Sequence, residues 1–192
     1  MRGLSGPLLS LDTLRTAGMD ACVGADPRIP TQLRTLIESA SARLGPASGT
    51  RQVVDVLVEP LLRLLGFDVD VCDDSAAAIA MKLLVRGRPA AALLVTPWGQ
   101  NQEAMWGAAV RHAGSLGVRW AFVANGPVLR LLDAERTYSR RAFDCALDRA
   151  AADDEALAAM ATVLRAEKFA AGLADIVDAS DRHRIDVGAS LQ

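Results

Sequence analysis

The fold is decided by residues 77–98, which read AAIAMKLLVRGRPAAALLVTPW. Two runs, Ala77–Val85, which is apolar apart from Lys82, and Ala90–Val95, which is wholly apolar, flank the polar segment Arg86-Gly87-Arg88-Pro89. A short connection that contains Gly and Pro between two strand-like runs predicts a β-hairpin. The second run is apolar throughout, which is typical of a strand covered on both faces. It therefore predicts the central strand of a sheet.

Periodic patterns also precede this hairpin. Arg51–Leu65 repeats apolar residues at helical spacing around Pro60, so we expect a helix that is kinked or split there and ends at Gly66. Phe67–Cys72 alternates apolar and acidic residues, which predicts a strand with one solvated face. We expect a turn to follow at Asp73-Asp74-Ser75.

Beyond the central strand, helical and strand-like patterns alternate again. We expect a helix over Gln102–Leu116, strands over Trp120–Ala124 and Val128–Asp133, and an amphipathic helix over Asp153–Ala170. A helix that joins two strands predicts that those strands are parallel. The expected fold class is α/β, with a mixed central sheet flanked by helices.

The chain divides into three expected segments. Residues 1–48 form an N-terminal helical extension, with helices near Leu8–Ala17 and over Gln32–Arg43. Residues 49–170 form the α/β domain. Residues 171–192 are more polar and form a C-terminal tail or linker, helical to about Asp178.

Composition limits the classes of function. A formal net charge of −2 over 192 residues gives no global basic field to attract nucleic acid. Cys22, Cys72 and Cys145 are odd in number and include no CxxC pair, so we expect no zinc site and a reduced, cytoplasmic setting. We expect no secretory leader, no membrane span and no glycine-rich phosphate loop.

Several pieces of the chain, taken in order, resemble a known family. They are Val58-Glu59-Pro60-Leu61-Leu62 with Leu64–Asp68, then Leu83–Pro89, then Gly117–Trp120 with Asn125-Gly126 and Leu131–Asp133. Their order and spacing are similar to those of the PD-(D/E)XK nucleases, in particular the N-terminal nuclease domain of type I restriction subunits and of fused type II restriction–modification enzymes. The resemblance covers about residues 50–170 and implies a restriction-endonuclease-like α/β fold.

The resemblance also implies where a catalytic site would lie. Such nucleases use a divalent metal, which requires hard oxygen ligands. The family's Asp falls at Ala80, and its Glu-X-Lys falls at Thr96 and Trp98. A Gln and a Tyr of the following helix fall at Ala108 and His112. Because none of these residue types is retained, we expect a degenerate site with no metal or other cofactor in a catalytically inactive domain.

In one alternative, the domain is an active, Mg²⁺-dependent DNA endonuclease. Its active-site residues would have migrated to neighbouring elements and would converge near the end of the central strand; the candidates are Glu59, Asp74, Lys82 and Glu103. The competing interpretation takes the two glutamates as solvated helix residues, the aspartate as a turn former and the lysine as an outward strand residue. We favour the competing interpretation.

Two groups of arginines are candidates for DNA contact. Arg86 and Arg88 flank the predicted hairpin turn, and Arg136, Arg140 and Arg141 follow the last predicted strand. Either group could contact phosphates. The alternative is a solvated turn and a surface whose charge is balanced by the acidic residues close by in the sequence.

These patterns predict a DNA-positioning or structural module of a restriction–modification or phage-defence system. Its expected partners are DNA and a DNA methyltransferase domain or subunit. A second hypothesis is a protein-interaction or assembly domain without DNA contact, which the near-neutral net charge favours. A third is an unrelated α/β fold that has the same order of elements.

Overall fold

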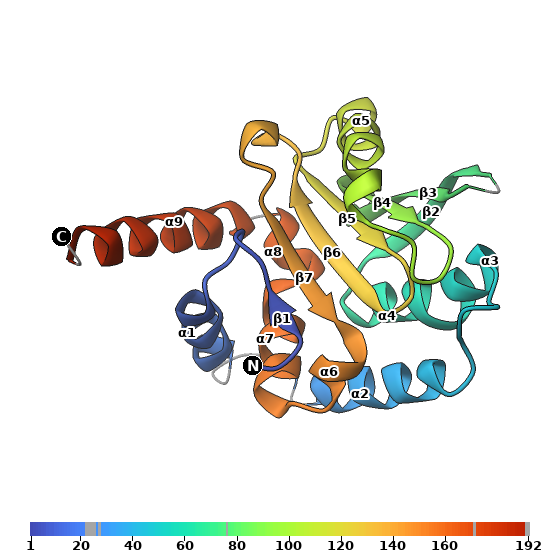
Figure 1. Cartoon of the computed structure of the whole chain (residues 1–192), viewed down its shortest axis with the longest axis horizontal. Coiled ribbons are helices and arrows are strands. Elements are labelled where there is room, and N and C mark those ends of the chain that lie inside the picture. Colours follow the sequence, from blue (N-terminus) through green and yellow to red (C-terminus); the bar gives the residue numbers. More distant parts are fainter. Residues whose placement is uncertain (22–25, 27, 76, 171, 191–192) are drawn as a thin grey trace.

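The centre of the protein is a seven-stranded mixed sheet with the strand order β1-β7-β6-β5-β4-β3-β2 (Figure 1). The computed structural model describes residues 1–21, 26, 28–75, 77–170 and 172–190. The strands are β1 (Leu4–Ser5), β2 (Asp68–Asp74), β3 (Ile79–Val85), β4 (Arg88–Val95), β5 (Trp120–Ala124), β6 (Val128–Asp133) and β7 (Ala142–Ala146). This α/β architecture confirms the expected fold class and is consistent with a restriction-endonuclease-like fold.

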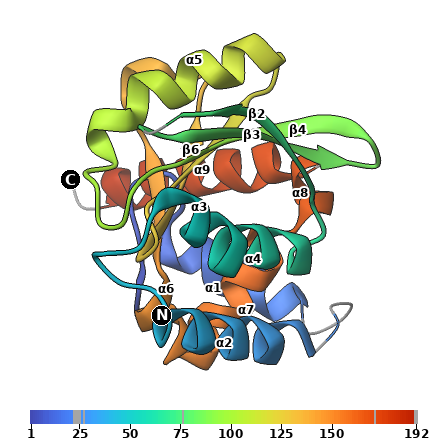
Figure 2. The same cartoon turned by 90° about the vertical axis from the view of Figure 1, so that its right-hand side faces the viewer.

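Helices cover both faces of the sheet. They are α1 (Leu11–Ala21), α2 (Arg28–Ser41), α3 (Thr50–Val53), α4 (Glu59–Leu64), α5 (Trp106–Leu116), α6 (Leu147–Ala151), α7 (Asp154–Val163), α8 (Ala166–Ala170) and α9 (Leu173–Ser190). Figure 2 shows α5 on one side of the sheet and α2, α3, α4 and α7 on the other. The larger apolar core lies on the α4 and α7 side. None of the described helices is long and apolar enough to cross a membrane.

The hairpin predicted from residues 77–98 is present. Strands β3 and β4 are antiparallel, and Val85 pairs with Arg88 across a two-residue turn. The two turn residues, Arg86 and Gly87, have φ angles of 51° and 76°, as a type I′ turn requires. Strand β4 pairs in parallel with β5 on its other side, so the predicted central position and parallel pair are both confirmed.

The predicted break in the helix before the hairpin is also present. A π-helical turn, Val54–Val58, lies between α3 and α4 and ends just before Pro60. Proline has no N–H for the i−4 carbonyl, so a regular α-helical ladder cannot pass through this position. The helix then ends as predicted at Gly66, where the Phe67 N–H donates to the Leu62 carbonyl over 3.0 Å.

The predicted turn at residues 73–75 is wrong in its first two positions. Asp73 and Asp74 continue β2 and pair with Ala80 and Ile79, because a bulge after Val71 resets the register. The predicted helix over Asp153–Ala170 is divided into α7 and α8. The Ala166 N–H donates to the Leu65 carbonyl, 2.9 Å away, and this tertiary bond replaces a bond within the helix.

The N-terminal segment contributes to the sheet itself. Strand β1 pairs with β7, and α1 and α2 pack against α7. Helix α2 begins at Arg28, earlier than expected, because the Asp26 carboxylate accepts the Arg28 N–H over 3.0 Å. At the other end, α9 runs to Ser190, beyond the expected end near Asp178. The division at residues 48 and 170 stays a prediction.

Strand β7 was not predicted and gives a direct test of the sheet. Cys145 lies in β7 with a fully buried side chain, and burial raises the pKa of its thiol well above the usual range. Cys72 in β2 is exposed. In a Cys22→Ser variant, which removes a thiol outside the described residues, we expect Cys72 to react readily with a disulfide reagent and Cys145 to react only after unfolding. Equal native rates for the two thiols, followed by absorbance, would contradict this placement of β7.

Candidate functional site

The candidate site is the carboxyl end of β4, where the resemblance places the catalytic Glu-X-Lys. Thr96 follows the last residue of this strand, and its side chain is fully buried. Its N–H donates to the Ala124 carbonyl over 2.8 Å, and its hydroxyl donates to the same oxygen over 3.3 Å. Thr96 therefore closes the gap between the ends of β4 and β5 and does not extend a carboxylate into solvent.

Trp98, at the family's lysine position, fills the space beside this closure. A Cβ built on Gly126 would lie 2.6 Å from the Trp98 ring carbon Cζ3, so the indole lies directly against the Gly126 α-carbon. The next residue, Gly99, donates its N–H to the Asn125 carbonyl over 2.9 Å. The ring is half-buried against the main core. It thus packs against the turn that follows β5.

Two buried amides complete the closure, and sequence reasoning missed both. Gln102 Nε2 donates to the carbonyls of Val123 (3.1 Å) and Val128 (2.8 Å). Asn125 Nδ2 donates to the Gln100 carbonyl over 2.8 Å, and its side-chain oxygen accepts the Val128 N–H over 3.0 Å. The only feature of the sequence that could have indicated them is that a polar residue follows β4 and β5 within a few positions. We refer to Thr96, Trp98, Gln102, Asn125 and Gly126 together as the β4–β5 closure.

The other degenerate positions hold α5 against the sheet. Ala80 pairs with Leu94 in the ladder, and it packs with Ala108 in the apolar cluster beneath α5. His112 Nε2 lies 2.8 Å from the Met81 carbonyl oxygen, so the imidazole bonds helix α5 to strand β3. These three residues perform packing and backbone bonding where the family has an Asp, a Gln and a Tyr.

The proposed migrated residues are not brought together. Each forms an ion pair with a different partner: Glu59 with Arg63 (2.7 Å), Asp74 with Arg51 (2.6 Å), Lys82 with Asp70 (3.4 Å) and Glu103 with Arg130 (3.0 Å). The described part of the chain contains no group of three or more His, Cys, Asp or Glu side chains placed to hold a metal ion. Its buried side-chain nitrogen and oxygen atoms all have hydrogen-bond partners.

The five candidate DNA-binding arginines fall into two classes. Arg136 pairs with Asp178 (2.7 Å) and Asp181 (3.0 Å) of α9, and Arg141 also pairs with Asp181. The hydrogen bond that Arg136 donates to the Asp178 carboxylate raises the pKa of Arg136. These two arginines attach α9 to the body of the protein. Their charges are therefore already compensated within the chain.

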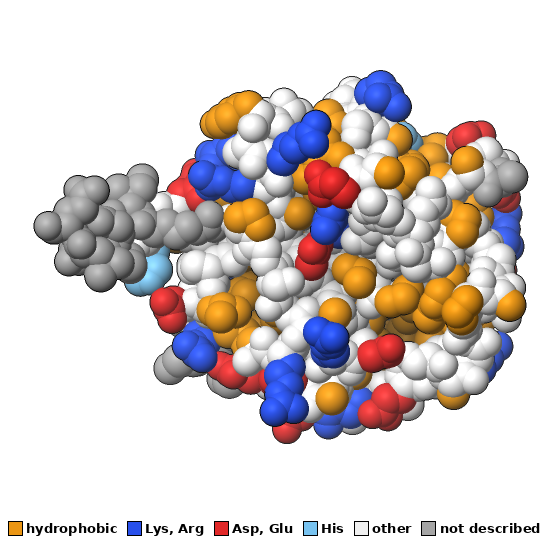
Figure 3. Space-filling view, in the orientation of Figure 1, with side chains coloured by type: hydrophobic (Ala, Val, Ile, Leu, Met, Phe, Trp, Pro, Cys, Tyr) orange, Lys and Arg blue, Asp and Glu red, His pale blue; other side chains and the backbone are white. Residues whose placement is uncertain are grey.

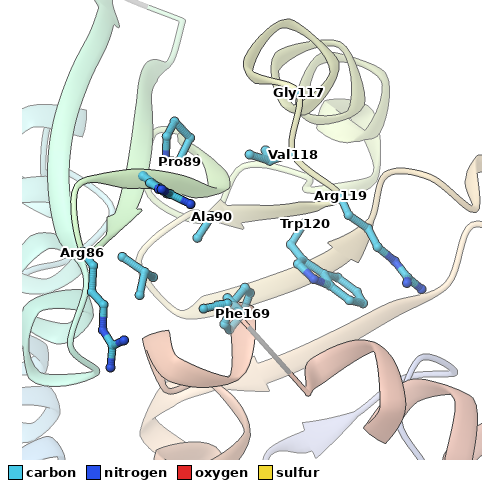
Figure 4. A pocket seen from close by; sticks show the side chains of 11 residues that line it. Arg86, Pro89, Ala90, Gly117, Val118, Arg119, Trp120 and Phe169 are labelled. Atoms are coloured by element: carbon cyan, nitrogen blue, oxygen red, sulfur yellow. The ribbon is translucent and has the colours of Figure 1, made fainter.

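The remaining three arginines are more open. Arg140 has a side chain that is 70% exposed, and its one ion-pair contact within the described part of the chain is a long one, 3.8 Å from Glu103. Arg86 and Arg88 are exposed at the β3–β4 turn, and neither side chain has a hydrogen-bond or ion-pair partner among the described residues. Both line a hollow of about 670 Å³ at the amino ends of β4 and β5, at the opposite end of these strands from the closure (Figure 4).

Comparison of the chain with protein-family models, with curated proteins and with solved structures found no match. The resemblance to the restriction nucleases therefore stays a prediction that depends on residue patterns and the order of elements.

The contact between Trp98 and Gly126 makes the closure testable. Gly126 has a φ of 89°, and an added Cβ would meet the indole ring. We expect Gly126→Ala to lower the free energy of unfolding by about 2–4 kcal/mol, from backbone strain and overpacking together. Urea denaturation of the variant and the native protein measures this difference.

Gly99→Ala is the matched control, because Gly99 has a φ of 68° in the same loop but open space around its α-carbon. We expect it to cost about 1 kcal/mol, the backbone contribution alone. In a Trp98→Ala background, Gly126→Ala should cost no more than this control, because the obstructing ring is gone. An undiminished cost in that background would contradict the packing described for Trp98.

Proposed function

We propose that this protein is a catalytically inactive, restriction-endonuclease-like domain that serves as a DNA-positioning or structural module of a cytoplasmic restriction–modification or phage-defence system. The observation that carries the proposal is the β4–β5 closure. At the end of the central strand, the space for a metal-bound water and a phosphodiester is taken by a buried hydroxyl, two buried amides and an indole ring. Neutral hydroxyl and amide groups do not supply the carboxylate charge that usually holds Mg²⁺ in proteins, and these groups are buried and bonded to the backbone.

The surroundings of the closure support the same proposal. Lys82 and Glu103 lie on different elements and are each held by an oppositely charged neighbour. A general base or a metal ligand must instead be free to face the substrate. Ala80 and Ala108 offer no heteroatom in their side chains. The expected partner in such a system is a DNA methyltransferase domain or subunit.

DNA contact has support at the tip of the β6–β7 connection. Tyr138 is 88% exposed in a short 3₁₀ turn, Thr137–Ser139, and the largely exposed Arg140 follows it. An exposed aromatic ring beside a guanidinium suits a nucleic-acid surface, through stacking and phosphate contact. These two residues are the proposed contact with DNA.

The second candidate function, an assembly domain without DNA contact, has its own support. Figure 3 shows basic and acidic side chains interspersed over one face, with no continuous basic stripe. Arg136 and Arg141 are compensated by α9, and the net charge is −2. A protein that bound duplex DNA non-specifically would need several uncompensated cations on one surface.

Catalytic inactivity is tested with supercoiled plasmid DNA and either Mg²⁺ or Mn²⁺. We expect no cleavage above a protein-free control, because the carboxyl end of β4 lacks metal ligands. An active restriction enzyme in the same buffers serves as the positive control. Cleavage that is abolished by Asp74→Ala or Glu103→Ala would contradict the proposal and favour the migrated set of Glu59, Asp74, Lys82 and Glu103.

DNA positioning and assembly are separated by binding to a short labelled duplex at several salt concentrations. DNA positioning predicts an affinity that falls steeply as salt rises and that weakens about threefold or more in Tyr138→Ala/Arg140→Gln. The matched control is Leu11→Ala/Arg15→Gln, which removes an exposed apolar side chain and an exposed arginine on α1. No binding at low salt would exclude DNA positioning and favour assembly.

A further inference from the structure

We propose that the hollow at the amino ends of β4 and β5 binds a nucleotide phosphate, with Arg86 and Arg88 on the phosphate. The ligand is a phosphate ester with a flat apolar part, either a free nucleotide or the 5′-phosphorylated end of a strand. The proposal does not depend on the proposed function, because this hollow and the β4–β5 closure lie at opposite ends of β4. It rests on the shape, the charge and the lining of the hollow.

The hollow exists because the hairpin extends past its neighbour. Strand β5 begins at Trp120, which pairs with Ala91, so the three preceding residues of β4 lie beyond the end of β5. The link Gly117–Arg119 between α5 and β5 bounds one side, and Phe169 and Ala170 at the end of α8 bound another. A volume of about 670 Å³ lies within the range of small-molecule sites.

The charge of the hollow is uncompensated on the hairpin side. Arg86 and Arg88 both line it, and both lack ion-pair partners among the described residues. Two unpaired guanidinium groups separated by one residue repel each other, and a bound dianion would relieve this repulsion. Guanidinium groups match phosphate oxygens in geometry as well as in charge.

Arg119, on the other side, is fixed and already paired. Its guanidinium donates to both carboxylate oxygens of the buried Asp133, with distances of 2.7–3.2 Å, and it lies 4.6 Å from the centre of the Trp120 ring. In Figure 4, Arg86 and Arg119 flank the hollow with Phe169 between them. Arg119 thus forms a rigid wall, and the free charge lies with Arg86 and Arg88.

The conformation of Arg86 is an independent sign that its side chain matters. The first central residue of a type I′ turn is most favourably Asn, Asp or Gly, because its φ is positive. Arg86 takes this position with a φ of 51°. Arginine is thus an unfavourable choice at this turn position, and the Arg86 side chain lines the hollow. The two facts together point to a role for this side chain other than forming the turn.

The lining suits a flat apolar group beside the phosphate. Pro89 and Val118 form apolar walls, and Trp120 and Phe169 pack edge to face with ring centres 6.3 Å apart. Trp120 and Phe169 are only 4% and 8% exposed, so they form a firm floor beneath the hollow. The exposed Pro89 and the half-buried Val118 are the apolar side chains that a ligand would contact most. A nucleobase presents a flat apolar face of this kind next to its phosphate.

The test is binding of the full chain to dAMP and dTMP by calorimetry at low salt. Deoxyadenosine and inorganic phosphate are the partial ligands. We expect both nucleotides to bind, the nucleoside not to bind, and inorganic phosphate to bind about tenfold more weakly or worse. A hexanucleotide with and without a 5′-phosphate, followed by fluorescence anisotropy, distinguishes the two sources of the ligand. Preference for the phosphorylated strand identifies a strand end, and mononucleotide binding alone identifies a free nucleotide.

Two kinds of variant locate the site. Arg86→Asn/Arg88→Gln removes both charges and keeps a residue that favours the type I′ turn, and we expect a loss of about tenfold or more in affinity. Val118→Trp fills the hollow without changing charge and should cause a similar loss. The matched control is Arg43→Gln/Arg149→Gln, which removes two exposed arginines from elements that do not line the hollow.

The proposal is overturned if neither nucleotide binds at millimolar concentration. It is also overturned if inorganic phosphate binds as tightly as the nucleotides, or if the control pair weakens binding as much as Arg86→Asn/Arg88→Gln. Thermal unfolding of every variant separates loss of the site from loss of the fold. If Arg86→Asn/Arg88→Gln fails to fold, nucleotide binding by Val118→Trp tests the proposal. Unchanged binding in that variant contradicts it.

Discussion

Where a parallel pair of buried strands ends, the chain must leave the sheet without leaving buried backbone N–H and carbonyl groups unpaired. An unpaired buried carbonyl or N–H costs about 1–3 kcal/mol, so each must find a partner. In this protein Gln102 and Asn125 supply those partners for Val123 at the carboxyl end of β5, for Val128 at the start of β6 and for Gln100 in the loop after β4. The neighbouring helix α5, the turn after β5 and the position of Trp98 all depend on this arrangement.

The same place is where a metal-dependent nuclease keeps its charged ligands. A carboxylate there must face solvent and a metal, whereas Thr96 and Asn125 face backbone carbonyls and N–H groups. A charged metal site and a closure that is bonded to the backbone cannot both occupy the small volume at the end of β4. The uncompensated charge of the hairpin lies instead at the opposite ends of the strands, with Arg86 and Arg88. The central strand therefore has a closed, neutral carboxyl end and an open, cationic amino end.

The sequence is informative where a pattern is local. The alternation around Arg86-Gly87 and the apolar run to Val95 predict the hairpin and the central strand, because strand periodicity and turn chemistry act over a few residues. Strand β1 escapes prediction because its pairing with β7 joins residues more than 100 positions apart, such as Leu4 and Cys145. Strand β7 also pairs with the neighbouring β6, but its residues Ala142–Ala146 show no clear alternation of apolar and polar side chains. Both strands are also short, at two and five residues.

In the candidate site, too, local features are visible in the sequence and long-range contacts are not. The absence of charged residues at Thr96 and Trp98 is visible in the sequence, but the use of Gln102 is not, because its acceptor at Val123 is 21 residues away. The compensation of Arg136 by Asp178 likewise spans 42 residues and exists only once α9 packs beside α1 and α8. Long-range partners decide whether a basic residue is available, and a single sequence does not reveal them.

The central claim is that the carboxyl end of β4 holds no metal site. It is tested most directly by titrating the full chain with Mn²⁺ and following the electron paramagnetic resonance signal of the free ion. A closed, neutral strand end predicts that the signal rises in proportion to added Mn²⁺, with no stoichiometric binding. A saturable site with one Mn²⁺ per chain that is lost in Asp74→Ala or Glu103→Ala would contradict it.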